Sequence, residues 1–567
     1  MPTTADLPPY DPARLLAAPF PERVRLVCRT WASQIMPTPM IVMAMYWAKY
    51  FLVYIGGWAF FVWLSAGSSG FTSPGGWAFS EVAFRKAILW SLFYELMGFG
   101  CGMGPMNARF NPPLGGFLHF LRPGTTKLPL FPGLPVLGRT RRSPLDVALY
   151  AANQLCLLRA LVAPEVTPAL MLPSAILIPL LGVTDKTLFL AARAEHYWVA
   201  LVCLTVAYAE ARWLSACKLV WCAIWFWAAT SKINNHFPSV IMVMMNNGPF
   251  FPRGLKQRLF TSYPDDLRPS RLAATMAHSG TCIEYSLAFL LPLLGGHTAL
   301  TVLMLCVMFC FHGFIAINNP SGMPVEWNIL MIYGGIFLFG FHPEASLLAI
   351  ARMPLLAAFL LFWLFAVPCF GNFVPARVSF LLAMRYYAGN WAYNIWLVRK
   401  GSAAKFNRLV KAAGTVREQF EKMLPDATAV ETALTLMMAH RFMHFEGRPL
   451  LEALPRAVDD IDAYEWMEGE VLGGMVLGWN FGDGHLNGAQ LLEAVQAQCG
   501  FEPGEVRVVM VESQPLFGRS MRWQIVDAAS GVIESGETEL AAMRGVQPFP
   551  TGRYAEAFEH PRPASSA

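Results

Sequence analysis

Residues 298–317 read TALTVLMLCVMFCFHGFIAI, a run without Lys, Arg, Asp or Glu in which His312 is the only residue with a basic side chain. A helix needs about 20 consecutive, mostly apolar residues to cross the hydrocarbon core of a bilayer. The run therefore predicts a transmembrane helix. Other stretches of similar length and hydrophobicity are interpreted in the same way.

The composition of the whole chain agrees with a membrane protein. Of 567 residues, 55% are hydrophobic and 14% are charged, whereas roughly a quarter of the residues of a soluble domain are charged. The net charge of +5 is too diluted to indicate a nucleic-acid partner. Eleven cysteines lie mostly in apolar stretches without a C-x-x-C pair, which argues against a disulfide framework or a structural zinc site.

Further apolar stretches predict about ten spans, with a range of eight to ten, in an all-α polytopic membrane bundle with the lipid bilayer as its partner. They lie near residues 38–65, 87–104, 145–163, 167–183, 197–209, 214–231, 272–295, 298–317, 327–342 and 353–371. Glu210, Arg212 and Lys218 interrupt the stretch 197–231. They mark either a hairpin turn or polar positions inside the bundle.

The loop charges predict an orientation. The connections 105–144 and 251–271 are rich in Arg and Lys, whereas residues 293–298 and 342–348 contain neither. Because basic loops stay in the cytoplasm, both loops and both termini are expected there. Arg85 and Lys86 fall on the opposite side and are exceptions to the pattern.

The remaining segments predict a small C-terminal soluble α+β domain. We expect a cytoplasmic N-terminal segment at 1–37, the bundle at 38–372, an interfacial hinge helix at 373–400, the soluble domain at 401–548 and a flexible tail at 549–567. Within the domain, Asp426 is placed to cap a helix over 427–445, and Asn487 with Gln490 to start a helix that ends near Cys499. Three strands are expected between Glu505 and Ala541, with a turn at 528–531.

Polar residues concentrate between 231 and 328, where an ionisable group in a span indicates pairing or function because its burial in lipid is costly. The candidate catalytic residues are Lys232, His278, Glu284 and His312, and the candidate substrate-binding residues are Asn234, Asn235, His236, Asn318, Asn319 and Glu326.

Each candidate also has a structural interpretation. Lys232 ends WCAIWFWAATSK, where it could extend to the lipid headgroups or, with a pKa lowered by apolar surroundings, act as a base. His278 and Glu284 lie about 120° apart around a helix, so their partners must come from other spans. His312 suits a buried hydrogen bond as well as catalysis, and the Asn-Asn pairs suit helix capping.

A helical metal site is not predicted in the soluble part. HRFMH places His440 and His444 at i and i+4, but no Glu follows His440, and His485 is the only third ligand to suggest itself. Likewise, GWNFGDGHLNG lacks the pattern of a nucleotide-binding loop.

Three motifs in order, WFWAATSKINNHF, GTCIEYSLAFLLPLL and CFHGFIAINNPSGMPVEWN, resemble the membrane domain of the vitamin K-dependent gamma-carboxylase-like (HTTM) superfamily over roughly residues 220–330. The whole chain, including MRYYAGNWAYNIW and VESQPL, resembles more closely an uncharacterised bacterial multi-pass transmembrane family of unknown function. The second resemblance implies a fold and no activity. The expected location is a bacterial inner membrane.

The first resemblance implies that Lys232 matches a base that deprotonates a reduced quinone, while Glu284 and His312 match polar residues of the bundle. This chain has one Lys where that family has a Lys-Lys pair, and Asn234 or Asn235 where an acidic residue follows. The expected function is an enzyme acting on a lipophilic small molecule, a quinone or lipid. The alternatives are a transporter or lipid carrier, and a membrane anchor for a partner-binding domain.

Overall fold

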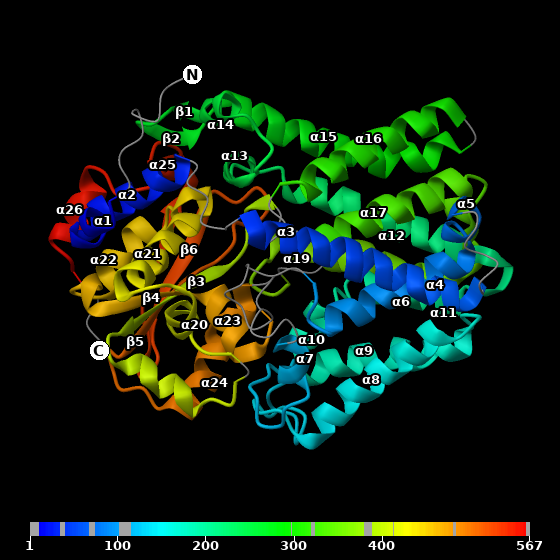
Figure 1. Cartoon of the computed structure of the whole chain (residues 1–567), viewed down its shortest axis with the longest axis horizontal. Coiled ribbons are helices and arrows are strands. Elements are labelled where there is room, and N and C mark those ends of the chain that lie inside the picture. Colours follow the sequence, from blue (N-terminus) through cyan, green and yellow to red (C-terminus); the bar gives the residue numbers. More distant parts are fainter. Residues whose placement is uncertain are drawn as a thin grey trace.

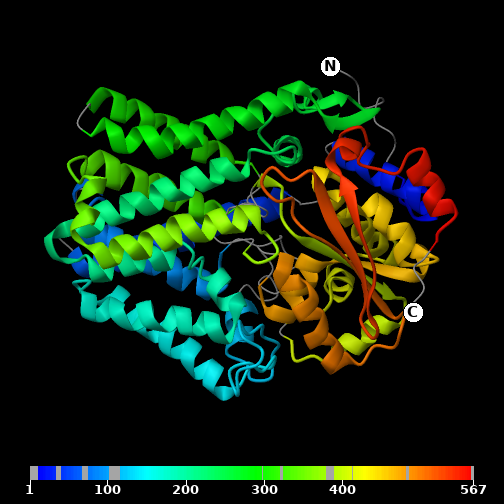
Figure 2. The same ribbon diagram turned by 180° about the vertical axis from the view of Figure 1, so that it is seen from behind.

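The computed structural model describes residues 11–33, 40–66, 74–100, 115–295, 298–318, 324–378, 388–411, 413–479 and 484–562. The chain forms a helical bundle and a C-terminal domain that lie side by side (Figure 1, and from behind in Figure 2). We call the end of the bundle that faces this domain the inner end, and the opposite end the outer end.

The bundle runs up and down through long apolar helices. Five of its described helices are long and apolar enough to cross a membrane, namely Met43–Ser65, Pro144–Val162, Arg212–Ser231, Thr298–Ala316 and Pro354–Phe373. The helices of this part of the chain are α3 (Met40–Ala48), α4 (Gly56–Ala66), α5 (Pro74–Ala78), α6 (Glu81–Leu96), α7 (Gly115–Phe120), α8 (Pro144–Val162), α9 (Pro168–Thr184), α10 (Lys186–Ala191), α11 (Tyr197–Val206), α12 (Arg212–Ser231), α13 (Phe237–Asn247), α14 (Arg253–Arg258), α15 (Arg271–Leu294), α16 (Thr298–Ala316), α17 (Val325–Gly335), α18 (Pro354–Leu361) and α19 (Val367–Phe373).

Helices occur at all ten of the predicted apolar stretches, and one of these stretches was placed wrongly. The expected helix at 87–104 is α6, which begins at Glu81 and ends at Leu96. Its second turn contains Arg85 and Lys86, which the sequence placed outside the span. Both side chains are buried, and each has a partner that compensates for its burial. Arg85 pairs with Glu81 at 2.5 Å, and the Lys86 ammonium donates to the Phe61 carbonyl at 2.6 Å.

The stretch 197–231 contains a hairpin turn between α11 and α12, which was one of the two interpretations. Lys218 lies inside α12, as the other interpretation required. Its ammonium donates to the carbonyl oxygens of His342 and Ala345, each at 2.7 Å. Both readings of this stretch therefore apply, each to different residues.

Side-chain caps explain where several helices begin. Ser143 and Asp146 form a capping box at α8, and the Ser270 hydroxyl accepts from the Ala273 amide at α15. Asp426 caps α21 (Ala427–Met443) as predicted. The helix α24 (Ala489–Cys499) is also as predicted, but its expected Asn487 cap is wrong, because Gly488 holds the cap position without a side-chain bond.

The C-terminal domain is built on a five-stranded antiparallel sheet in the order β4-β3-β5-β6-β7. Its strands are β3 (Tyr393–Arg399), β4 (Tyr464–Glu468), β5 (Val506–Val511), β6 (Ser520–Asp527) and β7 (Gly531–Glu539). The last three are the predicted strands. A small hairpin, β1 (Phe260–Ser262) and β2 (Asp266–Pro269), lies at the inner end of the bundle. Helices α20 (Val416–Met423), α22 (Leu450–Ala457), α23 (Gly469–Leu477) and α25 (Leu540–Arg544) complete the domain.

The interfacial hinge helix predicted at 373–400 is wrong where the structure describes it, and residues 379–387 lie outside the described part. Tyr393–Arg399 forms the strand β3, which pairs with β4 on one side and β5 on the other. Six of its seven residues are buried. A strand covered on both faces reads as a continuous apolar run. Of the aromatic residues that suggested a membrane belt, Trp391, Tyr393 and Trp396 are therefore part of the core of the domain.

The first and last described segments of the chain both pack on this domain. Helices α1 (Pro12–Ala17) and α2 (Phe20–Ala32) lie against α21. The tail expected to be flexible contains α26 (Arg553–Glu559), whose Phe558 ring lies 4.9 Å from that of Phe20. The prediction of a loose tail is therefore wrong for residues 549–562, because buried Phe549 and Tyr554 attach it.

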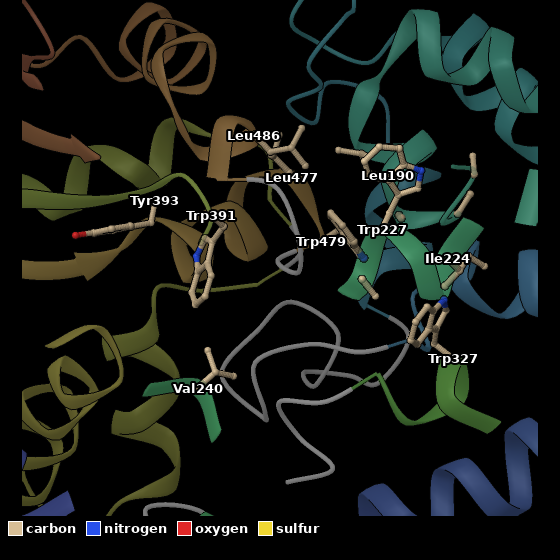
Figure 3. Close-up of a cluster of buried hydrophobic side chains, with 14 of the residues drawn as sticks. Leu190, Ile224, Trp227, Val240, Trp327, Trp391, Tyr393, Leu477, Trp479 and Leu486 are labelled. Carbon is tan, nitrogen blue, oxygen red and sulfur yellow. The ribbon is translucent and has the colours of Figure 1, made fainter. Parts of the chain in front are cut away.

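The bundle and the domain share one apolar cluster. Figure 3 shows Leu190, Trp227 and Trp327 from the bundle across from Trp391 and Leu477 of the domain. Hydrogen bonds from four separate regions cross the same junction: His236 to Gln514 at 2.9 Å, Phe445 to Ser239 at 3.0 Å, Gln490 to Pro129 at 2.9 Å and Gln547 to Asp266 at 2.9 Å. The two basic loops and the two described chain ends thus lie at one end of the bundle.

Arg441 connects the helices of the domain to its sheet. Its guanidinium donates to the carboxylates of Glu446 and Glu468 and lies 4.1 Å from the centre of the Tyr393 ring. The side chains of Arg441 and Glu446 are buried. Removing one member of such a network leaves the other charges buried without compensation.

We therefore expect Arg441→Met to lower the free energy of unfolding by about 3–5 kcal/mol. Arg456→Met is the control, because the Arg456 side chain is 52% exposed in its pair with Glu534 and its loss should cost about 1 kcal/mol or less. Denaturant unfolding of the purified full chain measures both. Equal losses for the two variants would contradict the structural role of Arg441.

Candidate functional site

Four of the candidate site residues gather in one layer, at the inner ends of α12, α16 and α17 and in the middle of α15. Lys232 follows the last turn of α12, Glu284 lies in α15, His312 lies in the last turns of α16, and Glu326 lies in the first turn of α17. All four are buried. The antiparallel order of the helices therefore brings polar residues that are distant in sequence into one layer beneath the C-terminal domain.

Lys232 points into the bundle and forms an ion pair with Glu284, with its Nζ 2.5 Å from Oε1. The ammonium also lies 5.1 Å from the centre of the Phe237 ring and 5.9 Å from that of Phe311. Only 5% of Lys232 is exposed, so the headgroup-anchor interpretation is wrong. A Lys that acts as a base must have no carboxylate within salt-bridge reach, and Lys232 does not meet this condition because Glu284 lies beside it. The mechanism in which Lys232 abstracts a proton is therefore dropped.

Glu284 uses one carboxylate oxygen for this pair. Its other oxygen, Oε2, is buried without a hydrogen-bond partner among the described residues. Next to Glu284 along α15, the hydroxyl of Tyr285 lies 2.9 Å from that of Thr230, which joins the same two helices again. The layer thus has a buried acceptor that no described residue uses.

His312 forms hydrogen bonds through both ring nitrogens. Nε2 accepts from the Trp225 indole N–H at 3.0 Å, so Nδ1 carries the proton and donates to the Asn328 side-chain oxygen at 2.8 Å. A ring bonded in this way stays in one tautomer and one orientation. The structural interpretation of His312, a buried bond to other helices, is confirmed.

The other candidates have local or linking roles. Asn234 accepts from the backbone amides of His236 and Phe237 at 2.7 and 3.0 Å, and thereby caps α13. Asn235 is half-buried in the same turn. The Asn318 side chain donates to the Phe314 carbonyl at 2.7 Å. Asn319 lies outside the described residues.

His278 and His236 lie apart from the Lys232–Glu284 pair. His278 is exposed on the outside of α15, so the structure does not bring it into the polar layer. His236 is buried at the start of α13 and faces Gln514 of the C-terminal domain. It belongs to the junction of the two parts.

A second buried charge cluster was missed by the sequence analysis. Arg193, in the break between α10 and α11, pairs with Glu95 at 2.7 Å and with Glu326 at 3.4 Å. Arg193 has a backbone φ of 46°, a left-handed conformation that is unusual for a residue with a side chain. The available signal was the presence of Glu95 and Arg193 in apolar surroundings, since such charges need partners.

Trp327 joins the two clusters. Its indole N–H donates to His196 Nε2 at 2.8 Å, and its ring centre lies 6.2 Å from that of His312. One contiguous layer therefore extends from Lys232 through His312 to Arg193.

Towards the outer end, aromatic side chains form a packed cluster, and the buried cations Arg85, Lys86 and Lys218 also lie in this half of the bundle. The rings of Phe84 and Phe337 stack at 4.5 Å, and Trp213 and Trp221 lie 5.7 and 5.8 Å from Phe84. Gly334 allows this packing, because a side chain at that position would collide with Trp221. The polar layer is thus separated from the outer end by a packed aromatic cluster.

In the C-terminal domain, His440 and His444 are neighbours, with ring centres 4.8 Å apart. Burial lowers the pKa of His444 to about 4, and its Nδ1 lies 2.6 Å from the His440 carbonyl oxygen. His485 instead lies 2.8 Å from Glu512. The described residues contain no cluster of three or more metal-ligating side chains. The absence of a metal at His440 and His444 stays a prediction.

Comparison with known proteins identifies the chain at the level of a family. Residues 2–557 match the family model described as "Transmembrane protein of unknown function (DUF3556)". No curated protein and no solved structure matches the chain. The match covers nearly the whole chain and includes both the bundle and the C-terminal domain. The protein therefore belongs to the DUF3556 family of transmembrane proteins of unknown function.

Proposed function

We propose that this protein is a membrane enzyme that acts on the polar head of a lipophilic molecule, a quinone or a lipid, at the inner end of its bundle. The observation that carries the proposal is the buried Lys232–Glu284 pair, whose second carboxylate oxygen has no partner among the described residues. An ionised side chain inside a membrane helix costs at least about 2.5–3.5 kcal/mol. A pair that served only to hold two helices together would not need an unpaired buried oxygen, so this oxygen favours a binding site over a bundle that only anchors a soluble domain.

Glu284 is the residue assigned to the substrate. Its Oε2 accepts a hydrogen bond from a hydroxyl or amide of the substrate head, while Lys232 balances the negative charge. His312 and Asn328 keep the wall of the site rigid, because both are locked in hydrogen bonds. Lys232 acts as a counter-ion in this proposal, and no carboxylation step is included.

The uneven distribution of polar residues favours this function over a carrier. A carrier that moves a polar group across the membrane exposes its site to both faces in turn. Here the charged layer adjoins the C-terminal domain, and the rings of Phe84, Trp221 and Phe337 pack between it and the outer end. The substrate therefore enters from the inner leaflet.

The test is mass spectrometry of the lipids and quinones that co-purify with the protein. We expect one lipophilic species to be enriched with the wild type and lost with Glu284→Gln and with Lys232→Met. The control is Lys218→Met in the same helix. Lys218 is also buried, 3% exposed against 5% for Lys232, but it lies at the outer end. Loss in all three variants, or retention in all three, would refute the proposed site.

The same variants report on the ion pair itself. Either single substitution leaves one buried charge uncompensated and should lower the free energy of unfolding by about 3–5 kcal/mol. The double variant Lys232→Met with Glu284→Gln removes both charges and should be close to the wild type in stability. A double variant that is stable but still retains the bound species would show that the pair has only a structural role.

We further propose that all ten predicted stretches cross a bacterial inner membrane, with both termini in the cytoplasm. The basic loops around Gly133 and Gly254 lie at the inner end beside the C-terminal domain, as the rule for positive loops requires if this end is cytoplasmic. An even number of spans returns the chain to the side where it began.

Labelling of introduced cysteines with a membrane-impermeant maleimide tests this orientation. Gly133→Cys and Gly254→Cys suit the purpose, because both positions have open space around an added side chain. In intact cells neither should react, whereas Leu348→Cys, at an 82% exposed position between α17 and α18, should react. The cysteines that are exposed among the described residues, Cys282, Cys306 and Cys310, are first replaced by Ala, together with Cys101, which lies outside the described part. If the two glycine positions react and Leu348→Cys does not, the orientation is the opposite of the one proposed.

A further inference from the structure

The C-terminal domain contains a cavity of about 620 Å³. Its walls are the turn between α1 and α2, the start of α20, one side of α21, the edge strand β4 and the helix α23. This volume lies within the range of about 300–1,000 Å³ that is typical of small-molecule sites. The cavity is distinct from the polar layer of the bundle, because none of the residues of that layer lines it.

The interior of the cavity is apolar and flexible. Four methionines line it together with Leu434, namely Met437, Met438, Met467 and Met475. Methionine side chains are unbranched and polarisable, so they adapt to ligands of irregular or variable shape. Such an interior suits a long aliphatic chain better than a rigid polar molecule.

Charged residues also line the cavity, and most of them already have partners. Arg23 pairs with Asp462 at 2.6 Å, and Arg417 pairs with Glu431 at 2.5 Å. Lys400 also lines the cavity, directly after β3, and forms no ion pair with a carboxylate among the described residues. It is an exposed cation that remains available to a ligand.

We infer that this cavity binds a single-chain amphiphile with an anionic head, such as a long-chain fatty acid. The aliphatic chain lies among the methionines, and the carboxylate lies beside Lys400. The carboxylates of the walls are held by arginines: Asp462 by Arg23, Glu431 and Glu465 by Arg417, and Glu468 by Arg441. This inference does not depend on the function proposed for the bundle.

A photoreactive long-chain fatty acid with a diazirine near its methyl end tests the inference on the full chain in lipid nanodiscs. Peptide mapping after illumination should find the label on the stretches 434–438 and 471–475. Lys400→Met should weaken the apparent affinity about two- to fivefold, as expected for the loss of one exposed charge contact. A fatty alcohol that competes as well as the acid would overturn the role of Lys400.

Filling the cavity provides the decisive variant. Leu434→Trp combined with Met475→Trp occupies its interior and should abolish labelling of both stretches. Met423→Trp is the control, since Met423 is 51% exposed on α20 and does not line the cavity. Undiminished labelling in a folded double variant would refute the inference. If that variant does not fold, absence of label from 434–438 and 471–475 in the wild type refutes it equally.

Discussion

The ion pair between Lys232 and Glu284 holds α12 against α15 at the end of the bundle that adjoins the C-terminal domain. Neither charge is stable alone among apolar helices, so each fixes the position of the other. Arg193 and Glu95 satisfy the same requirement on the neighbouring helices. The buried charges therefore constrain how these helices are arranged, and one carboxylate oxygen of Glu284 has no hydrogen-bond partner among the described residues.

This arrangement makes the two ends of the bundle chemically different. Polar side chains collect where the helices meet the soluble domain, and stacked rings such as those of Phe84 and Phe337 close the opposite half. The C-terminal domain is firmly attached to the bundle. His236 and Asp266 form hydrogen bonds with it, and the two parts share one apolar cluster. The domain covers the polar layer and has a separate apolar cavity.

Local signals in the sequence predicted local features. Uninterrupted apolar runs such as 298–317 became helices because their side chains and their helical backbone are satisfied within one segment. Asp426 capped α21, and the three predicted strands formed around the turn at 528–531. The likeness to a transmembrane family of unknown function also followed from the sequence, and the family match confirms it.

The sequence by itself therefore determined the membrane-bundle class, the places of most of its long helices and the concentration of polar residues between 231 and 328. The tertiary structure alone decided the partners of these residues. It gave Lys232 a carboxylate from α15 and left His278 exposed. It also made 393–399 a central strand instead of an interfacial helix. Hydropathy is a property of neighbouring residues, so it can be read directly from the sequence. An ion pair or a strand pairing joins segments that are distant in the sequence, and the sequence does not show which segments meet.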